Sequence, residues 1–336
     1  MSTKSKTTPP RKEAPDRDAW VTYRPEIKVL DCTVRDGGLI HNHEFHDTFV
    51  RAVYDTCAAA GVDYMEMGYK ASKRLFTRSA HGAWKFCDED DVRRICGEQP
   101  HPGVKLCAMA DAERTDYRED ILPREKSVLS MIRVATYIHQ IPTAVEMIQD
   151  AHDKGYETTV NLMALSAVRE HELGQALDVL AATPVDTIYV VDSYGSLYSE
   201  QIHALARLFK RAIEGTSKQI GIHTHNNQQL AFANSIEAIL EGINLIDATI
   251  YGFGRGAGNC PLELLLGFLR NPKFDQRPVI ACIEKHFLPL AREVDWGYSI
   301  PYMITGQLNQ HPREAMELRE SDRKEEFLAF YDKMME

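Results

Sequence analysis

The chain has 336 residues, 44% of them hydrophobic, and is therefore long enough to bury a sizeable core in one large domain or two small ones. Its formal net charge of −10, with no offsetting basic stripe, argues against nucleic acid as the main partner. No apolar run approaches the roughly 20 residues that a membrane-spanning helix needs, and the N-terminus lacks the apolar segment of a secretion signal. Seven scattered cysteines without a C-x-x-C pair are typical of reduced thiols in a cytoplasmic protein.

Residues 1–25 form a tail rich in Pro, Thr and Lys, which we expect to be disordered. From residue 26 onward, short apolar runs alternate with stretches of helical spacing. The runs predicted as strands are 28–33, 62–69, 104–111, 130–136, 157–166, 185–193, 218–225 and 243–252. Near-continuous apolar strands separated by helices indicate a parallel sheet covered on both faces.

Eight such units predict an α/β fold of the (β/α)8 TIM barrel type over residues 26–272. An open doubly wound sheet is the alternative, and it fits less well because no G-x-G-x-x-G follows the first strand. The periodicity of residues 273–336 is helical, which predicts a C-terminal extension packed on the barrel or on a partner.

Charged and polar residues gather at the predicted strand ends, which in such a barrel converge on one mouth. They include Arg35, Asp36, Glu66, Arg133, Asp192, His223, His225 and Asn259. Buried charges are costly unless they are paired or bound to a metal, so this accumulation predicts a functional site.

The segment GIHTHNN places two histidines one residue apart at the end of an apolar run. Strand side chains alternate between faces, so His223 and His225 both face the mouth while Thr224 faces the helical shell. Two imidazoles and a carboxylate suit a divalent metal that also binds substrate oxygens. Asp36 follows the first strand, which adjoins the eighth in a closed barrel, and is the natural third ligand.

Three motifs, LDCTVRDGG, HTHNN and GFGRGAGNCPLE, together resemble those of the DRE-TIM metallolyase superfamily. That group includes 4-hydroxy-2-oxovalerate aldolases, hydroxymethylglutaryl-CoA lyases, and isopropylmalate and homocitrate synthases. The resemblance covers about residues 27–272 and is strongest to the hydroxy-oxoacid aldolases.

The resemblance implies a barrel that binds Mn²⁺ or Mg²⁺ through Asp36, His223 and His225, with Asn259 nearby or ligating. It implies a small-molecule 2-oxo acid substrate whose carboxylate and keto oxygens chelate the metal. Arg35 would then stabilise an enolate. Glu66 would orient Arg35 or a metal-bound water, or it is a structural charge pair.

The chain also departs from the family pattern. Where those aldolases carry a histidine that acts as the catalytic base, this chain has Leu39. His41 or His43 would have to serve as the base from a shifted loop. The segment WGYSIPY resembles the stretch that bears a catalytic tyrosine, so Tyr298 is a candidate acid and Tyr302 a second.

Further expectations concern substrate and partners. Gly38-Leu39 stands where the acyl-transferring synthases carry Gln or Glu, which counts against acetyl-CoA condensation. Lys70, with Arg133, His81 and Lys73, is a candidate for a clamp on an acidic substrate. We expect a homo-oligomer, while a helical tail that looks shorter than in the aldolases counts against an aldehyde dehydrogenase partner.

The sequence therefore predicts a metal-dependent lyase that cleaves or forms a C–C bond in a 2-oxo acid. Two alternatives are a Claisen-type acyl-CoA-dependent condensing enzyme and a catalytically silent barrel that serves as a subunit. The intact metal set opposes the silent barrel, and Leu39 is the best support for it.

Overall fold

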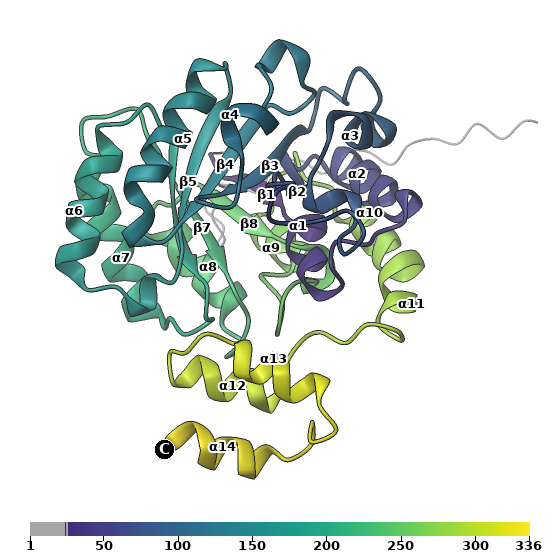
Figure 1. The fold of residues 1–336 in the computed structure, drawn as a ribbon, viewed down its shortest axis with the longest axis vertical. Coiled ribbons are helices and arrows are strands. Elements are labelled where there is room, and N and C mark those ends of the chain that lie inside the picture. The colour runs from purple at the N-terminus through teal and green to yellow at the C-terminus, as the bar shows by residue number, and fades with distance from the viewer. Residues whose placement is uncertain (1–23, 25) are drawn as a thin grey trace, which may run out of the picture.

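The structure of the protein, a computed structural model, describes residue 24 and residues 26–336. The expected disordered tail falls on residues that lie outside this description, apart from residue 24. Eight parallel strands close into a barrel in chain order, with β8 paired to β1 (Figure 1). The strands are β1 (Lys28–Asp31), β2 (Tyr64–Tyr69), β3 (Lys105–Asp111), β4 (Met131–Thr136), β5 (Glu157–Leu162), β6 (Thr187–Asp192), β7 (Gln219–Thr224) and β8 (Leu245–Ala248). The predicted (β/α)8 barrel is confirmed.

Helices alternate with the strands and cover the outside of the barrel, except for the short α1 at its mouth (Figure 1). Those up to the end of the barrel are α1 (Thr33–Gly37), α2 (Asp47–Ala60), α3 (Glu89–Cys96), α4 (Tyr117–Asp120), α5 (Ile141–Asp153), α6 (Glu170–Ala181), α7 (Ser199–Ala212), α8 (Ala231–Leu240) and α9 (Leu262–Leu269). The C-terminal helices are α10 (Gln276–Cys282), α11 (Leu288–Leu290), α12 (Ile300–Gln307), α13 (Arg313–Glu320) and α14 (Phe327–Met335). Among the residues described, no helix has the length and apolar character needed to cross a membrane.

The core is divided by the strands into an inner and an outer layer, because side chains alternate along each strand. Val29 packs in the outer layer under the helices, and its neighbour Leu30 packs in the inner layer. Tyr189 fills the barrel interior and is fully buried. Gly221 makes room for it, since a Cβ at that position would lie 2.5 Å from the tyrosine ring. The inner layer closes the floor beneath the mouth.

The first strand ends two residues earlier than predicted, and this difference shapes the site. Thr33 Oγ1 donates to Asp31 Oδ1 at 2.5 Å, and the Thr33 backbone N–H donates to Asp31 Oδ2 at 3.2 Å. The same hydroxyl accepts from the backbone N–H of Ile250 at 2.8 Å, which ties this turn to the segment after β8. The chain therefore turns into the short helix α1, which carries Arg35 and Asp36.

The C-terminal helices are present as predicted and fall into two groups. Helix α10 stays on the barrel shell, where the Asp275 backbone N–H donates to the Ala60 carbonyl at the end of α2, at 3.0 Å. Helices α12 to α14 lie as a separate layer beside the barrel (Figure 1). Tyr302 and Phe330 share a small apolar cluster with Ala257 of the loop after β8. This cluster attaches the outer layer to the barrel.

Candidate metal centre and its cavity

Asp36, His223 and His225 converge on one point at the mouth. His223 Nε2 lies 3.2 Å from Asp36 Oδ2, and His225 Nε2 lies 3.9 Å from the same oxygen. Each residue offers one ligand atom within 4.8 Å of the other two, and all three side chains are buried. Thr224 points the other way and donates to the Ala231 carbonyl of α8 at 3.1 Å. The alternation expected from the sequence holds.

Asn259 adds an amide to this group. Its Nδ2 lies 3.2 Å from His223 Nε2 and 3.5 Å from Asp36 Oδ2, and the residue pairs with His225 in an isolated bridge. Its Oδ1 is buried and has no hydrogen-bond partner among the residues that the structure describes. A buried acceptor without a partner is costly. The amide faces His223 and Asp36 through Nδ2, so Asn259 would ligate a cation once the amide is turned to bring Oδ1 to that side.

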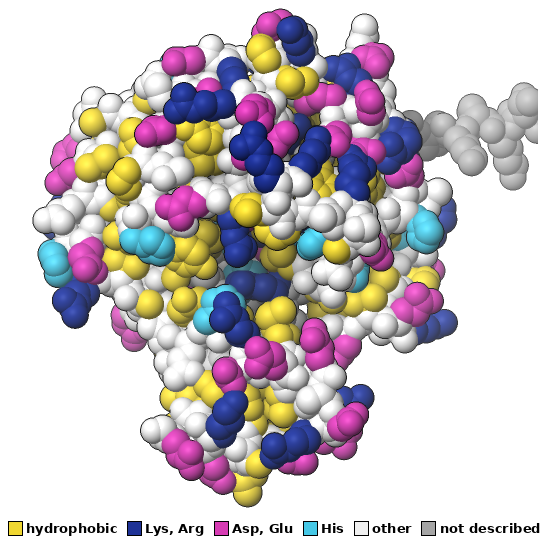
Figure 2. Space-filling model, viewed as in Figure 1, with side chains coloured by type: hydrophobic (Ala, Val, Ile, Leu, Met, Phe, Trp, Pro, Cys, Tyr) yellow, Lys and Arg dark blue, Asp and Glu magenta, His cyan; other side chains and the backbone are white. Residues whose placement is uncertain are grey.

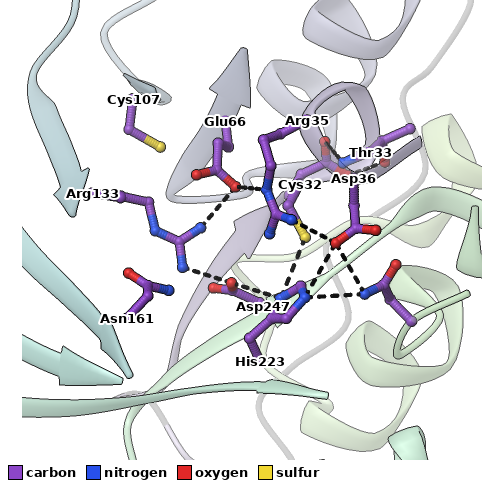
Figure 3. A network of polar contacts seen from close by, with 12 residues as sticks. Cys32, Thr33, Arg35, Asp36, Glu66, Cys107, Arg133, Asn161, His223 and Asp247 are labelled. Carbon is purple, nitrogen blue, oxygen red and sulfur yellow. Dashed lines mark hydrogen bonds and ion pairs between the residues drawn. The ribbon is translucent and has the colours of Figure 1, made fainter. Parts of the chain in front are cut away.

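The charges beneath the mouth also favour a cation. Arg35 contacts Asp36 Oδ2 at 2.6 Å and Glu66 Oε2 at 2.8 Å. Arg133 contacts the same Glu66 oxygen at 2.9 Å and Asp247 Oδ2 at 2.6 Å, as Figure 3 shows. Two guanidinium groups thus face three carboxylates. A buried excess of negative charge is what a bound cation offsets.

The pKa values follow from burial and from these neighbours. Burial alone would raise the pKa of Asp36, but Arg35 and the two imidazoles hold it well below its usual range. Burial lowers the pKa of His225 well below its usual value. The charge of Asp36 opposes this shift, and the charge of Arg255 adds to it. Asp36 is therefore ionised and His225 neutral at neutral pH, the forms in which both bind a metal.

Asp247 was not predicted as a site residue. Its Oδ2 lies 3.0 Å from His223 Nδ1, and its side chain is fully buried. Hydrogen bonds to Asp247 and Asp36 raise the pKa of His223, although burial by itself lowers it. A lone acid inside the apolar run INLIDATIYG was a signal that could have revealed Asp247.

The proposed substrate clamp is corrected by the structure. Arg133 is fully buried and bonded to Glu66 and Asp247 below the mouth, so it meets no solvent or substrate. Lys70 donates to the Cys87 carbonyl at 2.8 Å and lies 3.5 Å from Glu89. Because the charged groups of Arg133 and Lys70 are already bonded inside the fold, neither residue can bind an acidic substrate.

Asp36, His223 and His225 are called the ligand group below. A cavity of about 490 Å³ opens over this group. Arg35, Asp36 and both histidines of the group line its floor. Its walls come from strand ends and from the C-terminal layer, and include Tyr69, Asp111, Arg114, Tyr137, Asn161, Tyr194, Arg255, His311 and Arg313. His311 and Arg313 were missed by the sequence analysis because nothing in their local pattern places the extension over the mouth.

His41, His43 and Tyr298 lie elsewhere. The His41 ring packs against Phe45, with ring centroids 4.2 Å apart, and His41 does not line this cavity. His43 is buried against Tyr69, and burial lowers its pKa to about 3. Tyr298 is half exposed and lines an adjoining cavity of about 570 Å³, which shares Leu39 and Arg255 with the first. The structure does not bring these candidates to the ligand group.

Known proteins resemble the chain in sequence and in fold. The HMGL-like family matches residues 26–279. Oxaloacetate decarboxylase of Mycobacterium tuberculosis is 31% identical over 253 residues, which cover 74% of this chain and 71% of that protein. 4-Hydroxy-2-oxovalerate aldolase of Thermus thermophilus is 28% identical over 249 residues, covering 74% and 70%.

Among solved structures, the N-terminal domain of a candidate aldolase from Bacteroides vulgatus superposes with a TM-score of 0.77 at 30% identity. The match covers 88% of this chain and 97% of that one. The family match spans more than half of the chain, and its position agrees with the three motifs. The chain therefore belongs to the HMGL-like family of DRE-TIM metallolyases, as the motifs predicted.

Proposed function

We propose that the protein is a divalent-metal-dependent lyase that cleaves or forms a C–C bond in a 2-oxo acid of the 4-hydroxy type. The observation that carries the proposal is the convergence of Asp36, His223 and His225 on the floor of one cavity. The relatives named above, an aldolase and a decarboxylase, support a lyase over an acyl-CoA-dependent condensing enzyme.

Asp36, His223, His225 and the Asn259 oxygen would hold Mn²⁺ or Mg²⁺. The bound metal would act as a Lewis acid on the 2-oxo group. Arg35 is held by Glu66 through Nε and by Asp36 through one Nη, and its other Nη has no hydrogen-bond partner among the residues described and can donate into the cavity. Donors fixed in advance stabilise the negative charge that an enolate develops. Glu66 acts through Arg35 and is a positioning residue.

Asp111 is the carboxyl group that we assign to move a proton. Asp36 and Asp111 are the carboxylates that line the cavity among the residues described, and Asp36 is committed to the metal. Burial raises the pKa of Asp111, while Lys85 and Arg114 partly oppose the shift. A carboxyl group with a raised pKa transfers protons better near neutral pH. We therefore assign to Asp111 the role that the sequence suggested for His41 or Tyr298.

The proposal is tested with the purified protein, added Mn²⁺ and a panel of 4-hydroxy-2-oxo acids, by measuring the release of pyruvate. We expect chelation to abolish release, and Asp36→Asn to lower it by more than about 100-fold, because changes behind a ligand already cost about 10–100-fold. Asp178→Asn, the same change at an exposed position of α6, is the control and should be neutral. Metal-independent release, or an unaffected Asp36→Asn variant, would contradict the proposal.

A further inference from the structure

One wall of the cavity carries positive charge that the fold does not neutralise. Arg255 comes from the loop after β8, and His311 and Arg313 come from the start of α13 and the turn before it. Among the residues described, no carboxylate lies within 4.0 Å of the guanidinium of Arg255 or of Arg313. Arg255 is half-buried and Arg313 is exposed, whereas the buried Arg35 and Arg133 each contact an acid.

Arg255 is the fixed member of this wall. Its backbone N–H donates to Asp36 Oδ1 at 2.9 Å, and its Nη2 donates to the Ser193 carbonyl at 2.7 Å. Its Nε is buried without a hydrogen-bond partner among the residues described. The Nε–Nη edge of a guanidinium is the edge that binds a carboxylate through two parallel hydrogen bonds. Nη2 of this edge already donates to the Ser193 carbonyl and lies 3.4 Å from His225 Nε2, so Nε is the N–H left without a protein acceptor among the residues described.

His311 and Arg313 lie close to this arginine. Burial, together with the nearby charges of Arg255 and Arg313, lowers the pKa of His311 to about 4. The His311 ring meets Tyr194 edge-on, with centroids 5.7 Å apart. His311 is therefore a neutral hydrogen-bonding group between two cations. Figure 2 shows Lys or Arg and His side chains gathered in a hollow between the barrel and the C-terminal layer.

The carboxylates that line the cavity do not neutralise the positive charge of Arg255 and Arg313. Asp36 is engaged by Arg35 at 2.6 Å. Asp111 has its charge opposed by Lys85 and Arg114. Like charges that face one small cavity repel each other unless an anion enters. The wall is thus suited to an anionic group that arrives with the ligand.

We propose that Arg255, His311 and Arg313 form a second anion subsite, and that the substrate is a 2-oxo dicarboxylic acid. The 2-oxo acid end lies at the ligand group, and the distal carboxylate is bound by Nε of Arg255 and by the guanidinium of Arg313. A cavity of about 490 Å³ is large enough for a small diacid. The inference rests on the proposed function, because the first carboxylate needs the metal.

The test compares two five-carbon acids in the Mn²⁺-loaded protein by calorimetry. 2-Oxoglutarate and 2-oxovalerate both carry the 2-oxo acid group, lack a 4-hydroxyl group, and differ at the distal end in a carboxylate against a methyl. We expect 2-oxoglutarate to bind at least about tenfold more tightly, a difference of about 1.4 kcal/mol. Arg255→Gln and Arg313→Gln should each bring the ratio of the two dissociation constants towards one.

Arg323→Gln is the matched control, because Arg323 is an exposed arginine of the same layer that contacts Glu326 and lies outside the cavity. It should keep the wild-type ratio. Melting curves and Mn²⁺ titrations of every variant establish that each one is folded and loaded.

The outcomes separate the two claims. Equal binding of both acids to the wild type would overturn the second subsite and leave the metal-dependent lyase intact. A preference that survives in both arginine variants would also overturn it. Binding of neither acid to the loaded protein would overturn both the subsite and the proposed function.

Discussion

At the scale of single residues, Asp247 determines how His223 meets the ligand group. Its Oδ2 lies 3.0 Å from Nδ1 and accepts from it, so in the neutral imidazole Nε2 carries the lone pair that a metal would bind. Nε2 is the atom that lies 3.2 Å from Asp36. Arg133 fixes Asp247 from below at 2.6 Å. The second carboxylate thus sets the tautomer and the orientation of the ring.

Asp247→Asn is expected to weaken Mn²⁺ binding by about 10–100-fold, because the amide no longer favours the proton on Nδ1. Calorimetric titration of the metal-free protein with Mn²⁺ measures the effect without reference to activity. The change also disturbs a buried ion pair with Arg133, so the melting temperature of the metal-free variant must be recorded. A variant that is less stable but binds Mn²⁺ with wild-type affinity would show that Asp247 serves the fold alone.

The ligand residues were predictable because strand alternation is a local rule. His223 and His225 lie one residue apart, and the rule places both on one face whatever the rest of the chain does. Arg255 and His311 could not be predicted in this way. Their position over the mouth depends on contacts between the loop after β8 and the C-terminal layer, such as that of Ala257 with Tyr302. No local pattern encodes these contacts.

At the scale of elements, the loop after β8 closes the site. Gly254 lies so near the ligand group that a Cβ there would come within 1.8 Å of Asn259 Oδ1 and 3.1 Å of Asp36 Oδ1. Both oxygens belong to buried side chains that have no room to withdraw. The glycine therefore permits the loop to approach the ligands.

Gly254→Ala should displace Asn259 and weaken Mn²⁺ binding by about tenfold or more, as changes around a ligand set commonly do. Gly174→Ala in α6 is the control, since a Cβ there meets nothing within 4 Å. That control should leave Mn²⁺ affinity unchanged and raise stability slightly, because alanine favours a helix over glycine. Equal Mn²⁺ affinity in both variants would contradict the role given to the loop.

All eight predicted strands exist, although most end earlier than expected. Apolar runs reveal a buried strand, but they do not reveal where hydrogen bonding stops. In β1, the Thr33 hydroxyl bonds to Asp31 and turns the chain into α1. The C-terminal helices were likewise predictable from their periodicity, but not their place beside the mouth, because helical spacing says nothing about which surface a helix meets.

At the scale of the whole molecule, closure of the barrel assembles the site. β8 pairs with both β1 and β7, so residues far apart in the chain become neighbours at one rim. Asp36 and His223 meet for this reason alone. An open sheet would have left the first and last strands apart. The fold thus supplies the convergence on which the lyase proposal depends.

Burying the charged groups at the mouth of the barrel is unfavourable in free energy, and a bound metal would offset part of this penalty. Arg35, Glu66, Arg133 and Asp247 are buried together beneath the mouth, and removing such charges from water is unfavourable. Their mutual contacts return part of this free energy. The excess carboxylate and the unpartnered Asn259 oxygen remain, and they point to a cation as the missing component.

The position of Mn²⁺ in a crystal soaked with that ion, located by its anomalous scattering, tests this account most directly. We expect one strong peak about 2.1 Å from an Asp36 oxygen and from Nε2 of His223 and of His225. A peak away from these atoms, or none at a concentration that saturates the protein in solution, would contradict the account.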